Sequence, residues 1–188
     1  ISAFSFYPTK NLGAYGDGGL IATSNKKLAS RAIQLRKYGM KKLYYSEEHG
    51  INSRLDEVQA AILNIKLKKL KKWVIFRRKI AQIYNDGLKE TSLILPKENK
   101  YNFHSYYVYV VRHNDRDLII KKLKKKKIFC NISYPYPIHL MKGYSFLNYK
   151  KGDFPVSEKI AKQIFSLPMY PFLNMKKISK VLNCLKNV

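Results

Sequence analysis

The stretch SFYPTKNLGAYGDGG, residues 5–19, decides the fold, and it lies between two short runs typical of β-strands, residues 1–5 and 20–23. Four glycines and one proline indicate a tight turn whose backbone N–H groups can face a bound anion. Ser5 and Lys10 add a hydroxyl and an amine, which suit a phosphate contact and nucleophilic chemistry. The glycines lead into a strand, so neither common nucleotide-binding glycine motif matches. By composition alone, Lys10 is one lysine among 30, and a plain loop residue is the default interpretation.

A helical pattern follows the second strand. Residues 25–36 are predicted to form a helix that begins after the capping residue Asn25. Four of its apolar residues are expected to face inward: Leu28, Ala32, Ile33 and Leu35. Residues 38–50 are predicted to form a loop.

Ser53 and Asp56 match a capping box, which predicts the start of a long helix. A second helical segment is expected to end at Gly87. Beyond it the pattern indicates a small α/β unit of strands and amphipathic helices, with Asn114 and Asp117 capping its Lys-rich helix. The strands are expected at residues 105–112 and 128–132, and further helices at residues 157–165 and 175–186.

The composition is that of a folded domain. With 46% hydrophobic and 26% charged residues, the 188-residue chain is neither disordered nor collagen-like. No apolar run reaches the ~18 residues of a membrane-spanning helix. Cys130 and Cys184 lie far apart without a CxxC partner, which excludes a disulfide scaffold and indicates a reducing compartment, so we expect the cytoplasm. His49, His104 and His113 show no metal-ligand spacing, and no metal is expected.

The chain is strongly basic, with a formal charge of +25 that suggests nucleic acid or an anionic membrane surface as a partner. However, 30 of its 37 basic residues are lysines, whereas base and phosphate recognition favours arginine. The lysines cluster around residues 66–72 and 121–127, on the polar faces of amphipathic helices. This pattern favours solvated helix surfaces over a nucleic-acid groove.

Read as a phrase, residues 5–19 resemble the lysine segment of the DegT/DnrJ/StrS family of pyridoxal-phosphate (PLP) aminotransferases, which act on nucleotide-linked keto sugars. Six further phrases agree with the family in the same order, so the resemblance covers nearly the whole chain. They are LRKYG (35–39), GINSRLDEVQAA (50–61), HSYY (104–107), PIHL (137–140), GDFPVSE (152–158) and SLPMYP (166–171). Within the family, the likeness is greatest to aminotransferases acting at C3 of dTDP-linked 3-keto-6-deoxyhexoses.

The resemblance implies an α/β fold, namely the C-terminal part of a fold-type I PLP-dependent transferase. It divides the chain into a remnant of the large PLP-binding domain at residues 1–48, linking helices at 49–90 and a small α/β domain at 91–188. Family members carry the carboxylate that faces the pyridine nitrogen upstream of the lysine strand. Roughly half of a typical member is therefore expected to precede Ile1, and the fragment alone is expected to be inactive.

By the same resemblance, Lys10 forms the internal Schiff base with PLP and moves the proton during transamination; dehydratase relatives carry His there. Ser5 corresponds to the hydroxyl that binds the PLP phosphate, and Asn52 to the amide that reaches the phosphate of a neighbouring subunit. Without the resemblance, Ser5 reads as a strand-end serine and Asn52 as a turn residue. Arg54 is expected either to bind a substrate carboxylate or phosphate or to brace the helix start.

Ser133, Tyr134 and His139 fall where relatives place residues that face the sugar. The sequence departs from the family pattern here, since close relatives usually carry His at the position of Ser133 and Gln at that of Met141. An equal alternative for His139 is a structural imidazole that binds no ligand.

The sequence therefore predicts a fragment of a PLP-dependent aminotransferase that moves an amino group from an amino acid, glutamate in most relatives, to the keto sugar of a nucleotide sugar. The expected partners are these substrates and a second copy, in a homodimer with shared active sites. Two alternatives stay open: a non-catalytic basic module for nucleic acid or anionic membrane, and a regulator that keeps the PLP fold without its chemistry.

Overall fold

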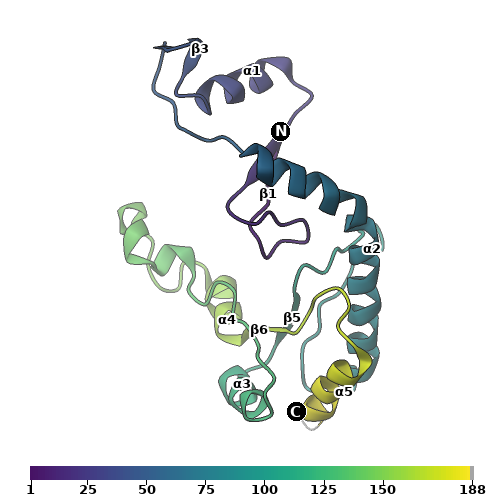
Figure 1. Ribbon diagram of the computed structural model, residues 1–188. Helices are drawn as coiled ribbons and strands as arrows, with labels where there is room; N and C mark the ends of the chain where they lie inside the picture. The colour runs from purple at the N-terminus through teal and green to yellow at the C-terminus, as the bar shows by residue number, and fades with distance from the viewer. Residues whose placement is uncertain (187–188) are drawn as a thin grey trace. The chain divides into compact units, whose positions relative to one another are not determined.

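The computed structural model describes residues 1–186, which form two compact units (Figure 1). The first unit covers Ile1–Lys72, and the second begins at Trp73 and holds the rest of the chain. The division falls inside the long helix α2 (Glu57–Leu88). The three-part division predicted from the sequence, with boundaries at residues 48 and 90, stays a prediction.

The first unit is built on a hairpin. Strands β1 (Ser2–Ser5) and β2 (Gly19–Ala22) pair antiparallel, with Ser5 opposite Gly19, so the glycine-rich stretch is the connection between two paired strands. Helix α1 (Lys26–Leu35) follows. The segment expected to be a loop instead contains a small antiparallel hairpin of β3 (Met40–Lys42) and β4 (Tyr45–Ser46).

The predicted cap of α1 is confirmed, because the Asn25 side chain accepts hydrogen bonds from the backbone N–H groups of Lys27 and Leu28. The predicted inward face of this helix is only partly correct. Ala32 and Leu35 are half-buried, whereas Leu28 and Ile33 are 42% and 52% exposed, and α1 contains no fully buried residue. Within the first unit, half of the apolar stripe is therefore exposed.

Helix α2 begins at Glu57, four residues after Ser53, so the predicted capping box does not form. The carbonyl of Asp56 instead accepts the first helical bond, from Ala60 N. Gly87 does not end the helix, which continues to Leu88. A Cβ at Gly87 would lie 2.7 Å from a methyl carbon of Leu182, so the glycine serves close helix packing rather than termination.

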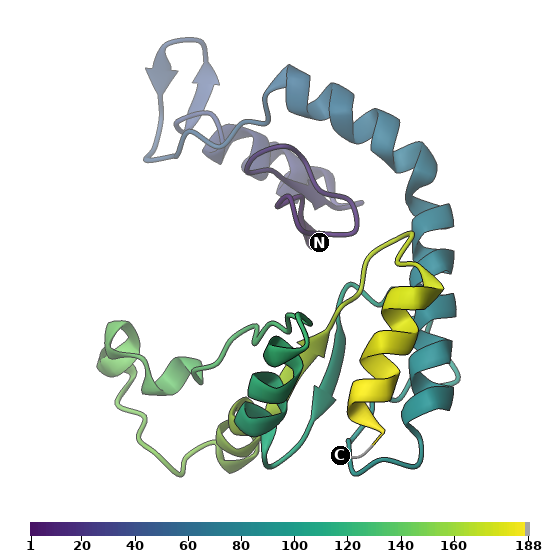
Figure 2. The ribbon, with the colours of Figure 1, turned by 60° about the horizontal axis from the view of Figure 1, so that its bottom comes forward.

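The second unit carries the hydrophobic core. Strands β5 (Tyr109–Arg112) and β6 (Ile164–Leu167) pair antiparallel. Figure 2 shows them beside each other, with α5 (Met175–Leu185) running along the second half of α2. The remaining helices are α3 (Arg116–Lys125), η1 (Ile138–Leu140), η2 (Lys142–Leu147) and α4 (Pro155–Gln163). The largest fully buried side chains lie on α2, β5, α3, β6 and α5: Tyr84, Leu88, Tyr109, Val111, Leu123, Phe165, Ile178 and Leu185.

Three sequence predictions in this unit need correction. Residues 128–132 form no strand and make only an isolated bridge between Asn131 and Ser166. The helix expected to run to residue 165 ends at Gln163, because Phe165 belongs to β6 and is buried in the core. Asn114 does not cap α3, since its side chain accepts a hydrogen bond from Gln163 instead.

The predicted positions of the Lys-rich faces are confirmed in α3, where Leu123 is buried while Lys121, Lys122 and Lys124 are exposed. None of the helices within residues 1–186 is both long enough and apolar enough to cross a bilayer.

Candidate functional site

The turn that joins β1 to β2 is closed by its own backbone. Phe6 N donates to Gly18 O at 2.8 Å, which continues the strand pairing, and Ala14 N donates to Phe6 O at 2.7 Å. Lys10 N donates to Tyr7 O at 2.8 Å, which places Lys10 at the end of a tight bend that contains Pro8 and Thr9. Lys10 itself is half-buried. The candidate nucleophile therefore lies in a fixed bend of a compact loop.

Gly13 is required by this closure. A Cβ at Gly13 would lie 2.4 Å from the carbonyl oxygen of Pro8 and 2.9 Å from that of Tyr7. These are backbone atoms, which cannot rotate away as a side chain could. The glycine thus allows two parts of the turn, on either side of Lys10, to pack backbone against backbone.

Two side chains of α2, Gln59 and Lys66, contact the same turn. The sequence pattern assigned no role to Gln59 and placed Lys66 on the solvated lysine face, which is wrong for Lys66 because it is half-buried. Gln59 Oε1 accepts a hydrogen bond from Tyr15 N at 2.8 Å, and Lys66 Nζ donates to Gly13 O. The one sequence signal was their spacing of seven residues, which places both on one face of a helix.

Ser5 lies at the end of β1, where the turn begins. Its hydroxyl is exposed and accepts a hydrogen bond from Tyr7 N at 3.2 Å. The Ser5 hydroxyl hydrogen can then donate to an anion. Ser5 and Lys10 consequently belong to one continuous turn.

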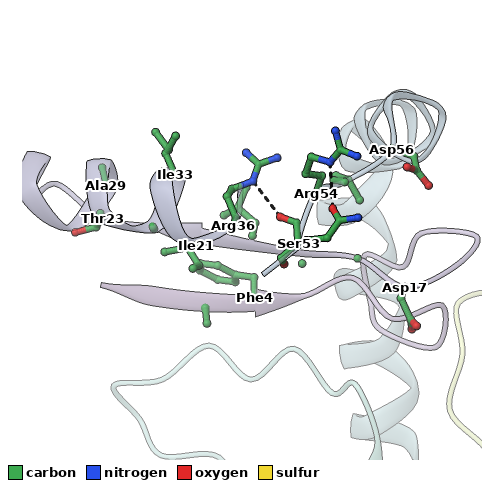
Figure 3. A pocket seen from close by; sticks show the side chains of 17 residues that line it. Phe4, Asp17, Ile21, Thr23, Ala29, Ile33, Arg36, Ser53, Arg54 and Asp56 are labelled. Atoms are coloured by element: carbon green, nitrogen blue, oxygen red, sulfur yellow. Dashed lines mark hydrogen bonds between the residues drawn. The ribbon is translucent and has the colours of Figure 1, made fainter. Parts of the chain in front are cut away.

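Asn52 and Arg54 are brought together just before α2. Arg54 Nε donates to Asn52 Oδ1 at 3.1 Å (Figure 3). Because the Asn52 oxygen is engaged, the amide nitrogen is the end of this side chain suited to donate to an anion. Arg36 steadies the segment from α1 by donating from Nε to Ser53 O at 3.0 Å.

Asn52 and Arg54 also line a hollow of about 980 Å³ in the first unit. Its other walls come from β1, β2, α1 and the end of the glycine-rich turn, and include Phe4, Asp17 and Ile33 (Figure 3). Neither Ser5 nor Lys10 lines it. The candidate catalytic site is the Lys10 turn, because it holds the amine, whereas the hollow lies over the partly exposed apolar stripe of α1.

Ser133, Tyr134 and His139 belong to the second unit. Ser133 Oγ accepts a hydrogen bond from Asn131 Nδ2 at 3.1 Å, and Tyr134 is exposed with a positive φ of 61°. His139 is buried on η1, and its Nε2 lies 3.0 Å from Glu158 Oε1.

Glu158 fixes the region around His139. Its Oε1 also accepts a hydrogen bond from Gly152 N at 2.8 Å, and the Gly152 N–H followed by His139 lowers the pKa of this carboxyl below its usual range. The His139 ring packs against Phe154, with centroids 4.8 Å apart. These contacts match the structural interpretation of His139, and its role as a sugar ligand stays a prediction.

No group of three or more His, Cys, Asp or Glu side chains that could hold a metal ion occurs in the part of the chain described.

Comparison with known proteins identifies the family of this chain. The profile of the DegT/DnrJ/EryC1/StrS aminotransferase family, a PLP-dependent family, matches residues 1–186. The chain is 49% identical over its whole length to a dTDP-3-amino-3,4,6-trideoxy-alpha-D-glucose transaminase of Micromonospora megalomicea subsp. nigra, of which it covers 52%.

Solved structures agree with this result. The chain superposes on Streptomyces venezuelae DesV with a TM-score of 0.94 and 37% identity, covering 98% of this chain and 50% of DesV. NtdA of Bacillus subtilis, solved with bound cofactor PMP, matches with a TM-score of 0.89 and 28% identity over 98% of this chain and 44% of its own. The chain thus spans about half the length of these relatives. The predicted fold class, part of a fold-type I PLP-dependent transferase, is confirmed. The chain belongs to the DegT/DnrJ/EryC1/StrS aminotransferase family.

Proposed function

We propose that this chain is part of a PLP-dependent aminotransferase that moves an amino group from an amino acid to the keto sugar of a nucleotide sugar. The observation that carries the proposal is the position of Lys10, an amine held in a glycine-closed turn at the end of a strand. Family membership supplies the class of reaction. The basic binding-module alternative gains no support from the relatives.

The residues present fit the phosphate end of the cofactor. Ser5 offers a hydroxyl where the turn begins, and the Asn52 amide nitrogen is suited to donate to the phosphate held by a second copy. The close backbone contact of Gly13 with Pro8 keeps this turn compact. When bound, PLP supplies an electron sink for the carbanion formed at the amino-acid α-carbon.

Lys10 Nζ has two tasks in this proposal. It holds the aldehyde carbon of the cofactor in the resting enzyme, and once displaced it is the base that takes up and returns a proton at its own nitrogen. Both tasks need an amine at a fixed place. The backbone hydrogen bond between Lys10 N and Tyr7 O provides that fixed starting point.

We assign Ser5 and Asn52 to cofactor binding. Asn52 is proposed to act on the phosphate held by a second copy, in a homodimer with shared active sites. Arg54 orients the Asn52 carboxamide through their 3.1 Å hydrogen bond, and its guanidinium is proposed to meet a substrate carboxylate or phosphate.

The proposed acceptor is a dTDP-linked 3-keto-6-deoxyhexose, and the proposed donor is glutamate. Support for the class of acceptor comes from the relative named dTDP-3-amino-3,4,6-trideoxy-alpha-D-glucose transaminase. Ser133, Tyr134 and His139 are proposed to face the sugar. Synthesis of such sugars from soluble nucleotide substrates supports a cytoplasmic enzyme.

The donor half-reaction tests the proposal without the sugar. The protein expressed from its native gene is loaded with PLP and mixed with glutamate, and 2-oxoglutarate is measured. We expect up to one equivalent of 2-oxoglutarate per site. Lys10→Ala is expected to reduce this yield at least 1,000-fold, on the order of what loss of the nucleophile and the base together costs. Lys69→Ala, at an exposed position of α2, is the matched control. Equal yields from the two variants would refute the role of Lys10.

A further inference from the structure

We infer that Gln59 and Lys66 on α2 are positioning residues for Lys10: they clamp the turn of residues 10–18 against the helix and thereby fix where the amine lies. The inference rests on the proposed function of Lys10. It concerns two residues that are not among those assigned above to cofactor or substrate binding.

Gln59 contacts the turn at Tyr15, five residues after Lys10. Its Oε1 accepts the hydrogen bond from Tyr15 N at 2.8 Å, and its side chain is half-buried. The adjacent Gly16 leaves room for this side chain, since a Cβ there would lie 3.2 Å from Gln59 Nε2, tighter than an ordinary contact.

Lys66 lies two helical turns further along α2 and contacts the same turn at Gly13. Its Nζ donates to Gly13 O and lies 5.3 Å from the centre of the Tyr15 ring. Lys66 is half-buried, whereas Lys68 and Lys69 on the same helix are exposed. A charged donor on a backbone carbonyl makes a stronger hydrogen bond than a neutral one. This lysine is therefore a contact residue of the turn and is not part of the solvated basic face.

The clamp reaches Lys10 through the backbone. Gly13, which Lys66 holds by its carbonyl, packs directly on the carbonyls of Tyr7 and Pro8. Tyr7 O in turn accepts the hydrogen bond from Lys10 N. If Gly13 is released from α2, the bend that carries Lys10 loses the backbone contact with Gly13 on one side.

Two measurements on the protein expressed from its native gene test the inference. The first is amide hydrogen exchange without cofactor, in which Gln59→Leu is expected to lower protection of the Tyr15 N–H about tenfold, as loss of one hydrogen bond predicts. The second is the rate of reductive pyridoxylation of Lys10, mapped by mass spectrometry. Lys66→Met is expected to slow it about tenfold, and Lys66→Arg to restore most of it, because arginine keeps a charged donor.

Controls separate positioning from folding and from the function itself. Lys69→Met should change neither measurement, and Gln59→Asn, which shortens the side chain by one methylene, tests the contact if Gln59→Leu does not fold. Unaltered pyridoxylation of Lys10 in both folded clamp variants would overturn the inference while leaving the proposed function intact. Failure of the parent protein to label at Lys10 would instead overturn the proposed function, and the exchange result would still decide whether the clamp exists.

Discussion

At the scale of single residues, the turn of residues 5–19 depends on the missing Cβ of Gly13. Sequence alone identified the glycine-rich turn and its amine, and the family resemblance singled out Lys10. It did not show which glycine is indispensable, because that depends on a backbone contact between Gly13 and Pro8 that only the folded turn contains. Gln59 and Lys66 were missed for the same reason: a helical spacing shows that two residues share a face, but not what that face contacts.

Gly13→Ala is expected to distort the turn. The added Cβ would meet the Pro8 carbonyl oxygen at 2.4 Å, and such overpacking costs on the order of 1–3 kcal/mol. This loss of stability is measured from amide exchange of residues 5–19 at increasing urea concentrations. Gly143→Ala is the control, because a Cβ there meets no atom within 4 Å. An equal, small effect of both substitutions would show that the Gly13 contact does not constrain the turn.

At the scale of elements, patterning predicted the helices and strands better than their ends. The cap at Asn25 was correct because it is a local contact. The strand β6 was missed because Phe165 continues the apolar spacing of α4, and only pairing with β5 makes the segment extended. Ser53 and Asp56 fit a capping box by residue type, yet the Ser53 N–H, which such a box would pair with Asp56, donates instead to the Arg36 carbonyl at 3.0 Å, a partner 17 residues away in sequence.

The ion pair that ties α2 to the segment after it predicts a pH dependence. Arg78 donates to both oxygens of Glu98, at 2.6 and 3.0 Å, and His104 N donates to Oε1. The Arg78 hydrogen bonds, followed by that of His104 N–H, lower the pKa of Glu98 from 4.5 to about 2. A carboxyl with a lowered pKa stabilises the fold fully above its unfolded value, so this contribution is lost as the pH falls from about 5 toward 2.

Urea unfolding midpoints at pH 6 and pH 3 measure that contribution. Glu98→Gln is expected to lower the midpoint at pH 6 and to flatten its decline toward pH 3, because the variant has no carboxyl to protonate. Glu90→Gln is the control, since the Glu90 side chain is 87% exposed. A parent-like decline in Glu98→Gln would contradict the assignment.

At the scale of the whole molecule, the two units differ in how many buried hydrophobic residues they contain. In the first unit, Ala14 and Leu63 are the buried hydrophobic residues, while the second unit contains a continuous core. The sequence predicted the amphipathic stripe of α1 but not that Leu28 and Ile33 would be exposed, because a helical period shows which residues share a face and not what covers that face.

The isolated chain is therefore expected to open first in its first unit. Helices α1 and α5 are suited to a matched test, because they have 10 and 11 residues but α1 has no buried residue and α5 buries Ile178, Val181 and Leu185. Amide exchange in the isolated chain should be at least 100-fold faster in α1, as expected for an element that opens locally. Equal protection would show that the exposed stripe of α1 is covered in solution.

The most direct test of the central claim is to find which lysine carries the cofactor. The protein expressed from its native gene is incubated with PLP, reduced with borohydride and digested, and the modified peptide is sequenced. The account predicts a single pyridoxyl group on Lys10, out of 30 lysines. A label on another lysine, or one spread over the exposed lysines of α2 and α3 without preference for Lys10, would contradict it.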